Sequence, residues 1–455
     1  MRKNETLCLR CEGLGSELEG IARLEGMPVF VPGMLPGEEG EVLIVKTQPN
    51  YAFGKLLSLG KNSPERREPF CGVYAHCGGC GGQHMSYEAT LEAKRSQVLE
   101  CLNRIGRLNL SPEQVLPPLG AENPLHCRNK AALPIGGTWK EPRIGFYRRR
   151  SHDIIPLEEC PISMQPLQPI VAAVKDWIIS KRIAPYEEQT RRGTLRHLVV
   201  RSSRAGQVMV LLVATSDKLP HPEKLAQSLK AAVPGFCALH LSVNRAAGNV
   251  ILGPSSQKLW GADHIEETLL GREFEIPPLS FFQVNPDQTE KLYQTALDMA
   301  ALTGRETVVD AYAGAGTISL CMASSARRVL GIEIVPQAVE GAWRNAERNG
   351  VTNAEFVCAP VEDCLPRRIA EGLRPDVVVL DPPRKGAEPQ VLEAILQAAP
   401  RRIVYISCHV PTQARDAAIL CGGGQYRLKY AQSVDLFCYT GGIENAALFE
   451  RVEVN

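Results

Sequence analysis

The sequence predicts an α/β protein in which a parallel sheet is preceded by a small β-barrel and a mixed α+β central region. From residue 271 onward, short apolar runs alternate with stretches of helical period, as expected of βαβ units. Residues 1–60 instead contain short strand-like runs separated by Pro and Gly turns, which favours a barrel of the oligonucleotide-binding type. A charged, Pro-containing linker opens the region between them. We therefore expect three domains, at residues 1–60, 61–270 and 271–455.

Composition limits the classes of function. The 455 residues include 51 Lys and Arg and 50 Asp and Glu, so the formal net charge is only +1. A nucleic-acid partner must therefore be bound by local basic patches. No apolar run approaches membrane-spanning length and the first residues carry no secretory signal, so we expect a cytoplasmic protein. Fifteen cysteines, an odd number, indicate thiol or metal chemistry rather than a disulfide scaffold.

The first 60 residues hold the runs that predict the barrel. These are residues 20–24, 28–31, 40–45 and 51–57. Cys8 and Cys11 form a CxxC pair, but no second pair lies nearby. We interpret them as ordinary cysteines rather than as half of a metal site.

A glycine-rich segment, residues 71–82, contains Cys71, Cys77 and Cys80. Glycines let the backbone fold tightly enough for three thiolates to approach one centre. Cys160 is the best candidate for a fourth ligand, because it is followed by proline, as in many iron–sulfur runs. Soft thiolates bind zinc or an iron–sulfur cluster, and the spacing leaves both open beside a loop of free thiols.

Basic residues concentrate in the central region. Residues 143–152 combine four arginines with Phe146 and Tyr147, as expected of a surface that pairs phosphates and stacks bases. A second basic group consists of Arg191, Arg192 and Arg196. The alternative for both groups is a solvated run of charge. Before them, residues 86–106 carry the apolar spacing of a helix.

Three positions in the C-terminal region follow predicted strands. The turn at residues 311–317, AYAGAGT, lets a ligand approach the backbone, but it is not GxGxxG, which weakens a nicotinamide site. Glu333 ends the next strand, where a ribose diol is usually bound. Asp381 ends a third strand and is followed by Pro382 and Pro383, which fix the loop.

Cys408 ends a further apolar strand at residues 404–407. Ligands of open α/β sheets bind at the carboxyl ends of the strands, so this thiol is a candidate nucleophile. The alternative is a buried core cysteine. A surface acid at Glu333 or a helix cap at Asp381 would explain each residue alone. Neither explains why one sheet edge collects the glycine turn, both acids and the thiol.

Together these motifs resemble the RNA uracil-5-methyltransferase family, which makes 5-methyluridine in ribosomal or transfer RNA with S-adenosylmethionine. The resemblance spans nearly the whole chain. It implies a Rossmann-like class I methyltransferase domain, an N-terminal TRAM barrel and a central domain that binds RNA. Residues 281–285, FFQVN, look like the family's FxQxN segment, and Ser407 and Cys408 match its nucleophile motif.

The resemblance also implies residue roles. The cofactor site would be lined by Gln283, Tyr312, Gly314, Glu333 and Asp381, and a [4Fe-4S] cluster would be bound by Cys71, Cys77, Cys80 and Cys160. Residues 434–444 resemble the family's VDxFPxTxHxE signature, which puts Glu444 at the position of the catalytic base. Cys438 replaces the usual proline and Gly442 the usual histidine, while the glutamate is retained. Ala313 stands where many members have cysteine.

The expected chemistry is covalent catalysis. Addition of the Cys408 thiolate to carbon 6 of uracil makes carbon 5 nucleophilic, and Glu444 would later remove the carbon-5 proton. The target base must leave its stack or be single-stranded. The barrel and the cysteines favour 23S rRNA as substrate, by resemblance, and a monomeric enzyme.

Other classes of function remain as alternatives. Transfer RNA is the alternative substrate, and an RNA-binding protein with a degenerate methyltransferase domain is the alternative class. A radical enzyme would need a CxxxCxxC run, and here the first gap is five residues. A methyltransferase directed at amino groups would not need Cys408.

Overall fold

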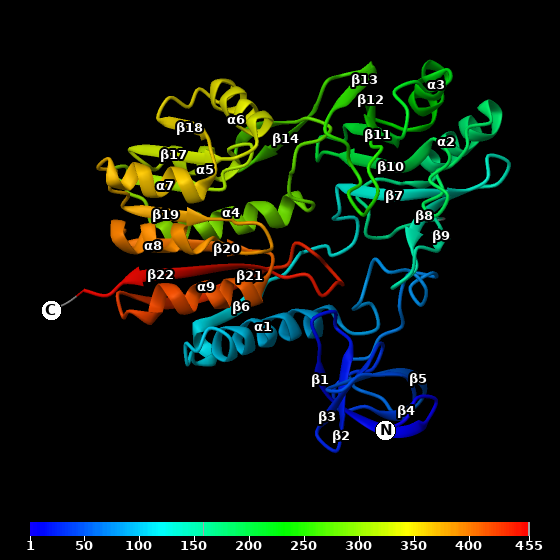
Figure 1. Ribbon diagram of the computed structural model, residues 1–455, viewed down its shortest axis with the longest axis horizontal. Helices are drawn as coiled ribbons and strands as arrows, with labels where there is room; N and C mark the ends of the chain where they lie inside the picture. The colour runs from blue at the N-terminus through cyan, green and yellow to red at the C-terminus, as the bar shows by residue number, and fades with distance from the viewer. Residues whose placement is uncertain (158, 454–455) are drawn as a thin grey trace.

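An eight-stranded sheet forms the C-terminal half of the computed structural model, which describes residues 1–157 and 159–453 (Figure 1). Its strand order is β18-β17-β16-β19-β20-β22-β21-β6. The strands are β6 (Val115–Leu119), β16 (Thr307–Ala311), β17 (Arg328–Glu333), β18 (Ala354–Cys358), β19 (Val377–Leu380), β20 (Arg402–Ser407), β21 (Tyr426–Val434) and β22 (Glu444–Arg451). The strands from β18 to β20 pair in parallel, whereas β22 is antiparallel to both of its neighbours.

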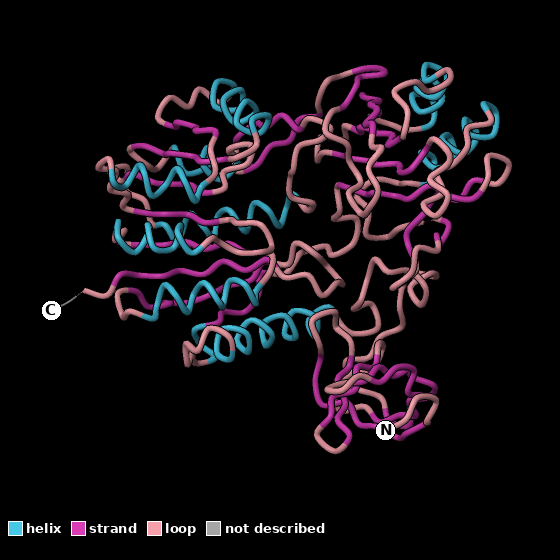
Figure 2. The backbone as a smooth tube through the Cα atoms, viewed as in Figure 1, coloured by secondary structure: helices cyan, strands magenta, loops and turns pink. Residues whose placement is uncertain are grey.

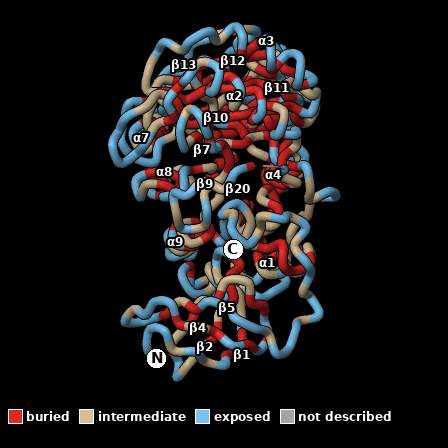
Figure 3. Tube along the Cα trace, turned by 90° about the vertical axis from the view of Figure 1, so that its right-hand side faces the viewer, coloured by how far each residue is buried: buried red, intermediate tan, exposed pale blue. Residues whose placement is uncertain are grey.

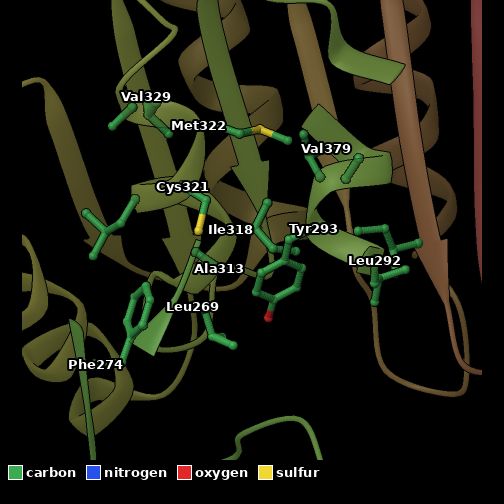
Figure 4. Packing of buried hydrophobic residues seen from close by; sticks show 14 of the residues in the cluster. Leu269, Phe274, Leu292, Tyr293, Ala313, Ile318, Cys321, Met322, Val329 and Val379 are labelled. Atoms are coloured by element: carbon green, nitrogen blue, oxygen red, sulfur yellow. The ribbon is translucent and has the colours of Figure 1, made fainter. Parts of the chain in front are cut away.

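Helices cover both faces of this sheet. On one face lie α4 (Pro286–Ala300), α5 (Thr317–Ala323) and α6 (Pro336–Arg348), and on the other α1 (Tyr87–Arg104), α7 (Val361–Ala370), α8 (Pro389–Ala398) and α9 (Val410–Gly422). Strand residues alternate between two hydrophobic clusters, so that Val308 faces α4 and α5 while Val309 faces the other side. Figure 4 shows Tyr293 of α4 beside Ile318 of α5. Burial on both faces explains why these strands are nearly continuous apolar runs.

A seven-stranded sheet forms the central region, in the order β13-β12-β11-β10-β7-β8-β9. Its strands are β7 (Lys130–Gly137), β8 (Pro142–Tyr147), β9 (Ile154–Pro156), β10 (Leu195–Ser202), β11 (Val208–Ala214), β12 (Phe236–Val243) and β13 (Ser256–Gly261). The helices α2 (Gln168–Lys181) and α3 (Pro222–Ala232) pack on this sheet in a third hydrophobic cluster. A hairpin of β14 (Ile265–Leu269) and β15 (Arg272–Ile276) leads to α4.

The N-terminal strands close into a five-stranded barrel with a hydrophobic core of its own (Figure 3). They are β1 (Thr6–Leu14), β2 (Gly20–Leu24), β3 (Met27–Val31), β4 (Glu39–Thr47) and β5 (Ala52–Lys61). Cys11 lies in this core and Cys8 is exposed, so β1 directs the two thiols to opposite sides. The segment from the barrel to α1 runs mostly without helix or strand (Figure 2).

Two segments cross the boundary that the sequence predicts between the central and C-terminal regions. The predicted helix at residues 86–106 is observed as α1, and it packs against α9 of the C-terminal sheet. β6 pairs in parallel with β21 and becomes the edge strand of that sheet. Across the described ranges, no helix has the length and apolarity needed to cross a membrane.

The barrel is joined to the following segment by a charge pair. Arg66 donates through Nε and Nη2 to the two carboxylate oxygens of Glu38, each at 2.6 Å, and the Glu38 side chain is fully buried. Burial alone would raise the pKa of this carboxyl. The donors Arg66 and the backbone N–H groups of Ser63 and Leu35 outweigh burial and hold the pKa below its ordinary value.

We expect Arg66→Ala to loosen the barrel, because it leaves a buried carboxylate without its partner, at a cost of about 3 kcal/mol. Hydrogen exchange of barrel amides should accelerate roughly 100-fold. The same stabilisation should disappear as the pH falls below about 4, since the pKa of Glu38 is lower in the folded state. Arg23→Ala is the matched control, because its pair with Glu12 is exposed and contributes at most about 1 kcal/mol. Equal exchange in both variants would contradict this role for Arg66.

Candidate active site

The candidate site lies where the strand order of the large sheet reverses. β16 is flanked by β17 and β19, so the loops after these strands diverge and leave a crevice at their carboxyl ends. The turn after β16 has positive φ at Tyr312 (72°), Gly314 (57°) and Gly316 (79°). A Cβ on Gly316 would lie 2.9 Å from the Phe356 ring, so only glycine fits there. The sequence motif AYAGAGT therefore forms a tight turn into α5.

Glu333 joins the end of β17 to this turn. Its carboxylate accepts hydrogen bonds from the Gly314 N–H at 2.9 Å and from the Val335 N–H at 2.8 Å. The side chain is only partly buried. Glu333 at the end of β17 is thus hydrogen-bonded to the turn that carries Tyr312 and Gly314, and the role of these residues in binding a cofactor stays a prediction.

Asp310, at the end of β16, is a site residue that the sequence analysis did not single out. It is buried, and its Oδ2 accepts a hydrogen bond from Ser319 Oγ at 2.5 Å. Its Oδ1 has no partner among the described residues. Burial raises the pKa of this carboxyl to about 7. The sequence did contain a signal for Asp310, namely an acidic residue at the end of a buried apolar strand.

Cys408 and Glu444 are brought together by the pairing of β20 with β22. Ser407 pairs with Asn445. Cys408, directly after β20, therefore lies opposite Glu444, the first residue of β22. Glu444 is buried, whereas Cys408 is partly accessible. The core-cysteine alternative is therefore disfavoured, because the thiol lies at the edge of the sheet beside an acid.

Burial and neighbouring negative charges raise the pKa values of the thiol and the acids at this edge. Burial, together with the carboxylates of Glu444 and Asp381, raises the pKa of Cys408 to about 11, and the charge of Arg384 opposes this shift only in part. Burial and the charge of Asp381 hold the pKa of Glu444 well above its ordinary value. Burial and the charge of Asp310 raise the pKa of Asp381 in turn. Burial and mutual repulsion therefore favour the protonated form of the thiol and of the acids at this edge.

Gln283 lies in the segment that leads into α4. Asn129, just before β7, donates through its backbone N–H to Val284 O at 2.8 Å and through Nδ2 to Gln283 O at 3.2 Å. Asn285 caps α4 by accepting from the Gln288 N–H at 3.3 Å. These contacts attach the FFQVN segment to the central sheet. They leave Phe281 76% exposed.

The four predicted ligand cysteines, Cys71, Cys77, Cys80 and Cys160, line one cavity of about 750 Å³. Arg149 donates to Cys80 O at 2.6 Å. This bond fixes residues 71–82, the cysteine segment, against the arginine-rich segment at residues 143–152. Across the described residues, no three His, Cys, Asp or Glu side chains gather closely enough to hold a metal ion. The structure places the four thiols around one space, and the iron–sulfur cluster stays a prediction.

The arginines of the second basic group, at positions 191, 192 and 196, lie in two different environments. Arg196 is buried, donates to Asn244 O and Ala246 O at 3.0 and 2.8 Å, and stacks on Tyr186. It therefore holds the central domain together instead of facing a ligand. Arg191 and Arg192 are exposed.

Comparison with known proteins gives the family. Residues 244–452 match the model described as tRNA (Uracil-5-)-methyltransferase, and residues 2–57 match the TRAM domain. The chain is 41% identical over 454 residues to an uncharacterized RNA methyltransferase of Clostridium acetobutylicum, covering 100% of this chain and 98% of that relative. It is 44% identical over 449 residues to one of Clostridium tetani, covering 98% and 97%. The chain belongs to the RNA uracil-5-methyltransferase family.

A solved structure agrees with this family assignment. The crystal structure of Pyrococcus abyssi tRNA (uracil-54, C5)-methyltransferase in complex with S-adenosyl-L-homocysteine aligns with a TM-score of 0.78 and 28% identity, covering 97% of this chain and 100% of that one. The predicted fold class and enzyme class are confirmed. The family and the TRAM domain also support the predictions of RNA as the substrate and S-adenosylmethionine as the methyl donor.

The protonated state of Cys408 can be measured. We expect alkylation by iodoacetamide at pH 8 to be roughly 100-fold slower at Cys408 than at the exposed Cys8, because only the thiolate reacts. Glu444→Gln should accelerate the reaction at Cys408, since it removes a charge that raises this pKa. Glu393→Gln, on the exposed face of α8, is the matched control. Peptide mass spectrometry after a short pulse gives the rates, and equal rates in both variants would refute the coupling.

Proposed function

We propose that this methyltransferase modifies carbon 5 of a specific uridine through a covalent adduct between Cys408 and carbon 6, with Glu444 as base. The register of β20 and β22 carries this proposal, because it opposes the two residues at the ligand-binding edge of the sheet. Asp381 follows β19, the strand beside β20. Its charge raises the pKa of Cys408 and the pKa of Glu444. A thiol and a buried acid at this edge suit a reaction that needs one nucleophile and one base.

We propose that the methyl donor binds in the crevice lined by Gln283, Tyr312, Gly314, Glu333 and Asp381. Two observations support the fit: Gly314 has a positive φ and a Cβ there would meet nothing within 4 Å, so the backbone is open to a ligand, and the buried Asp310 Oδ1 lacks a partner among the described residues. When bound, S-adenosylmethionine supplies an electrophilic methyl group and a positive charge. Glu333 is placed to accept from a ribose diol, as acids at this strand end do.

The chain's own groups would then act in order. The Cys408 thiolate forms a bond to carbon 6, and the displaced π electrons make carbon 5 nucleophilic. After carbon 5 has taken the methyl group, Glu444 removes its proton. The C–H electron pair forms the C5–C6 double bond and expels the Cys408 thiolate. A raised pKa suits Glu444 to this step, because a base works best when its pKa lies near the operating pH.

We propose that RNA crosses the face formed by the barrel and the central sheet. Arg150 stacks over Phe53 of the barrel at 4.4 Å, next to an aromatic group that includes Phe30 and Tyr51. Arg128, Arg148 and Arg150 are exposed and line one cavity at this face. Phosphates of the RNA would neutralise these charges.

The substrate we favour is 23S rRNA. The tRNA enzyme of Pyrococcus abyssi makes transfer RNA the second candidate, since it matches this chain over nearly its whole length. We propose that the enzyme acts as a monomer. We propose domains at residues 1–60, 61–270 and 271–455, with α1 and β6 of the second range packed on the sheet of the third.

The test is nucleoside mass spectrometry of 23S rRNA and tRNA from cells lacking the gene. We expect 5-methyluridine to disappear from 23S rRNA and to return when the purified enzyme and S-adenosylmethionine are added. Loss of 5-methyluridine from tRNA alone would make tRNA, and not 23S rRNA, the substrate. No loss from either RNA would overturn the enzyme proposal in favour of a degenerate RNA-binding protein.

Two variants test the residue roles within this experiment. Cys408→Ala should abolish methylation, because no adduct can form. Glu444→Gln should slow turnover about 10²–10⁴-fold and accumulate a covalent protein–RNA adduct, since elimination needs the base. Near-normal methylation by Cys408→Ala would exclude it as the nucleophile.

We also propose that Cys71, Cys77, Cys80 and Cys160 bind a [4Fe-4S] cluster. The donor set supports this proposal, because four thiols line one cavity and iron–sulfur clusters are held by cysteine thiolates. The reaction transfers no electron, so the proposed role is structural or in shaping the RNA site.

Anaerobically purified protein should be brown and contain iron and sulfide, which absorbance and elemental analysis measure. Cys77→Ser should lower the iron content, whereas Cys8→Ser, in the barrel, should not. Colourless protein with one zinc per chain would contradict the cluster.

A further inference from the structure

The loop that leads to Glu444 is fixed by contacts from outside the sheet. Residues 435–443 connect β21 to β22, and Glu444 is the first residue after them. Within this loop Asp435 and Cys438 are almost completely buried. The strand register sets where Glu444 lies, and the loop sets the direction from which the chain enters β22.

Helix α1 holds the start of this loop. Lys94 Nζ lies 2.5 Å from Asp435 Oδ1 and donates to Phe437 O at 3.1 Å. Tyr87 Oη donates to Asp435 Oδ2 at 2.6 Å and accepts from the Ala121 N–H at 2.8 Å. Lys94 and Asp435 are both inaccessible to solvent, so each oxygen of this carboxylate is committed to one donor on α1.

The cysteine segment and the barrel hold the rest of the loop. The N–H groups of Gly81 and Gly82, directly after Cys80, both donate to Tyr439 O at 2.9 Å. The Tyr439 ring packs on Tyr87 with centroids 5.5 Å apart. Gly441 lies so close to the barrel that a Cβ there would be 2.1 Å from Ser16 O.

The loop has little means of orienting Glu444 by itself. Gly442 carries no side chain, and Cys438 does not restrict the backbone as proline would. The Cys438 thiol instead lies 3.8 Å from Tyr87 Oη. The orientation of the acid therefore depends on tertiary contacts, and the strongest of these come from α1.

We propose that Tyr87, Lys94 and Asp435 are positioning residues for the base, and that through this loop the cysteine segment sets the orientation of Glu444. The inference rests on the proposed function, because it assumes that Glu444 removes the carbon-5 proton. Displacing the loop should slow proton removal selectively. RNA binding and addition of Cys408 should continue at their normal rates.

The test compares Tyr87→Phe with the unmodified enzyme on RNA whose uridine carries deuterium at carbon 5. The substitution removes one hydroxyl, which frees Asp435 Oδ2. We expect kcat to fall on the order of tenfold and KM to fall with it, because kcat/KM reports the steps up to methyl transfer, which stay unchanged. A primary isotope effect on turnover and an accumulated Cys408–RNA adduct should accompany the fall, because elimination becomes slower than methyl transfer.

Tyr426→Phe is the matched control. Its hydroxyl is also buried and donates to Pro400 O at 2.6 Å, but it lies at the opposite end of β21. Loss of folded protein alone would lower the amount of active enzyme without changing the isotope effect, and thermal unfolding of both variants measures that loss. We expect the control to keep the isotope effect of the unmodified enzyme.

Two results would overturn the inference in different ways. If Tyr87→Phe shows neither isotope effect nor adduct while Glu444→Gln accumulates adduct, the positioning role is wrong and the proposed function stands. If Glu444→Gln turns over normally, the base assignment itself fails, and the positioning role fails with it.

Discussion

The antiparallel insertion of β22 between β20 and β21 is the constraint on which the proposed chemistry depends. A parallel strand in that place would begin at the opposite edge of the sheet and carry Glu444 away from the thiol. Because β22 runs the other way, its first residue meets the last residues of β20. Two residues 36 positions apart thus become neighbours through backbone hydrogen bonds, the most rigid support the fold can offer. Side-chain contacts then need only set the direction of the acid.

That arrangement has an electrostatic cost. Asp310, Asp381 and Glu444 are acids with raised pKa values at one edge, and two of them raise the pKa of Cys408. The charge of Arg384 acts in the opposite direction, but burial and the two carboxylates outweigh it, so the pKa of Cys408 stays raised. In the proposed mechanism the positive charge of the methyl donor would add to that of Arg384 and favour the thiolate.

Much of this site could be predicted from the sequence, and the remainder could not for a physical reason. Strand ends followed by Glu333, Asp381 and Cys408 are local patterns, so position in the chain was enough to place them at one edge. The Lys94–Asp435 pair joins residues 341 positions apart, and each reads alone as an ordinary surface charge. Arg196 was grouped with its exposed neighbours because burial is not visible in a run of charge. The packing of α1 and β6 on the C-terminal sheet could not be predicted, because their apolar faces carry no local sign of which sheet they cover.

The loop at residues 435–443 explains why three regions are kept in one chain. It touches α1, the cysteine segment and the barrel within nine residues, and none of these belongs to the parallel strands that form the crevice. Arg149 and Arg150 tie the arginine-rich segment to the cysteine segment and to the barrel. RNA bound on that face would press on the same segments that hold the loop. If RNA binds on this face as proposed, substrate binding and the orientation of Glu444 share one set of contacts. An RNA that fits poorly would then leave Glu444 misoriented and turn over slowly even when bound.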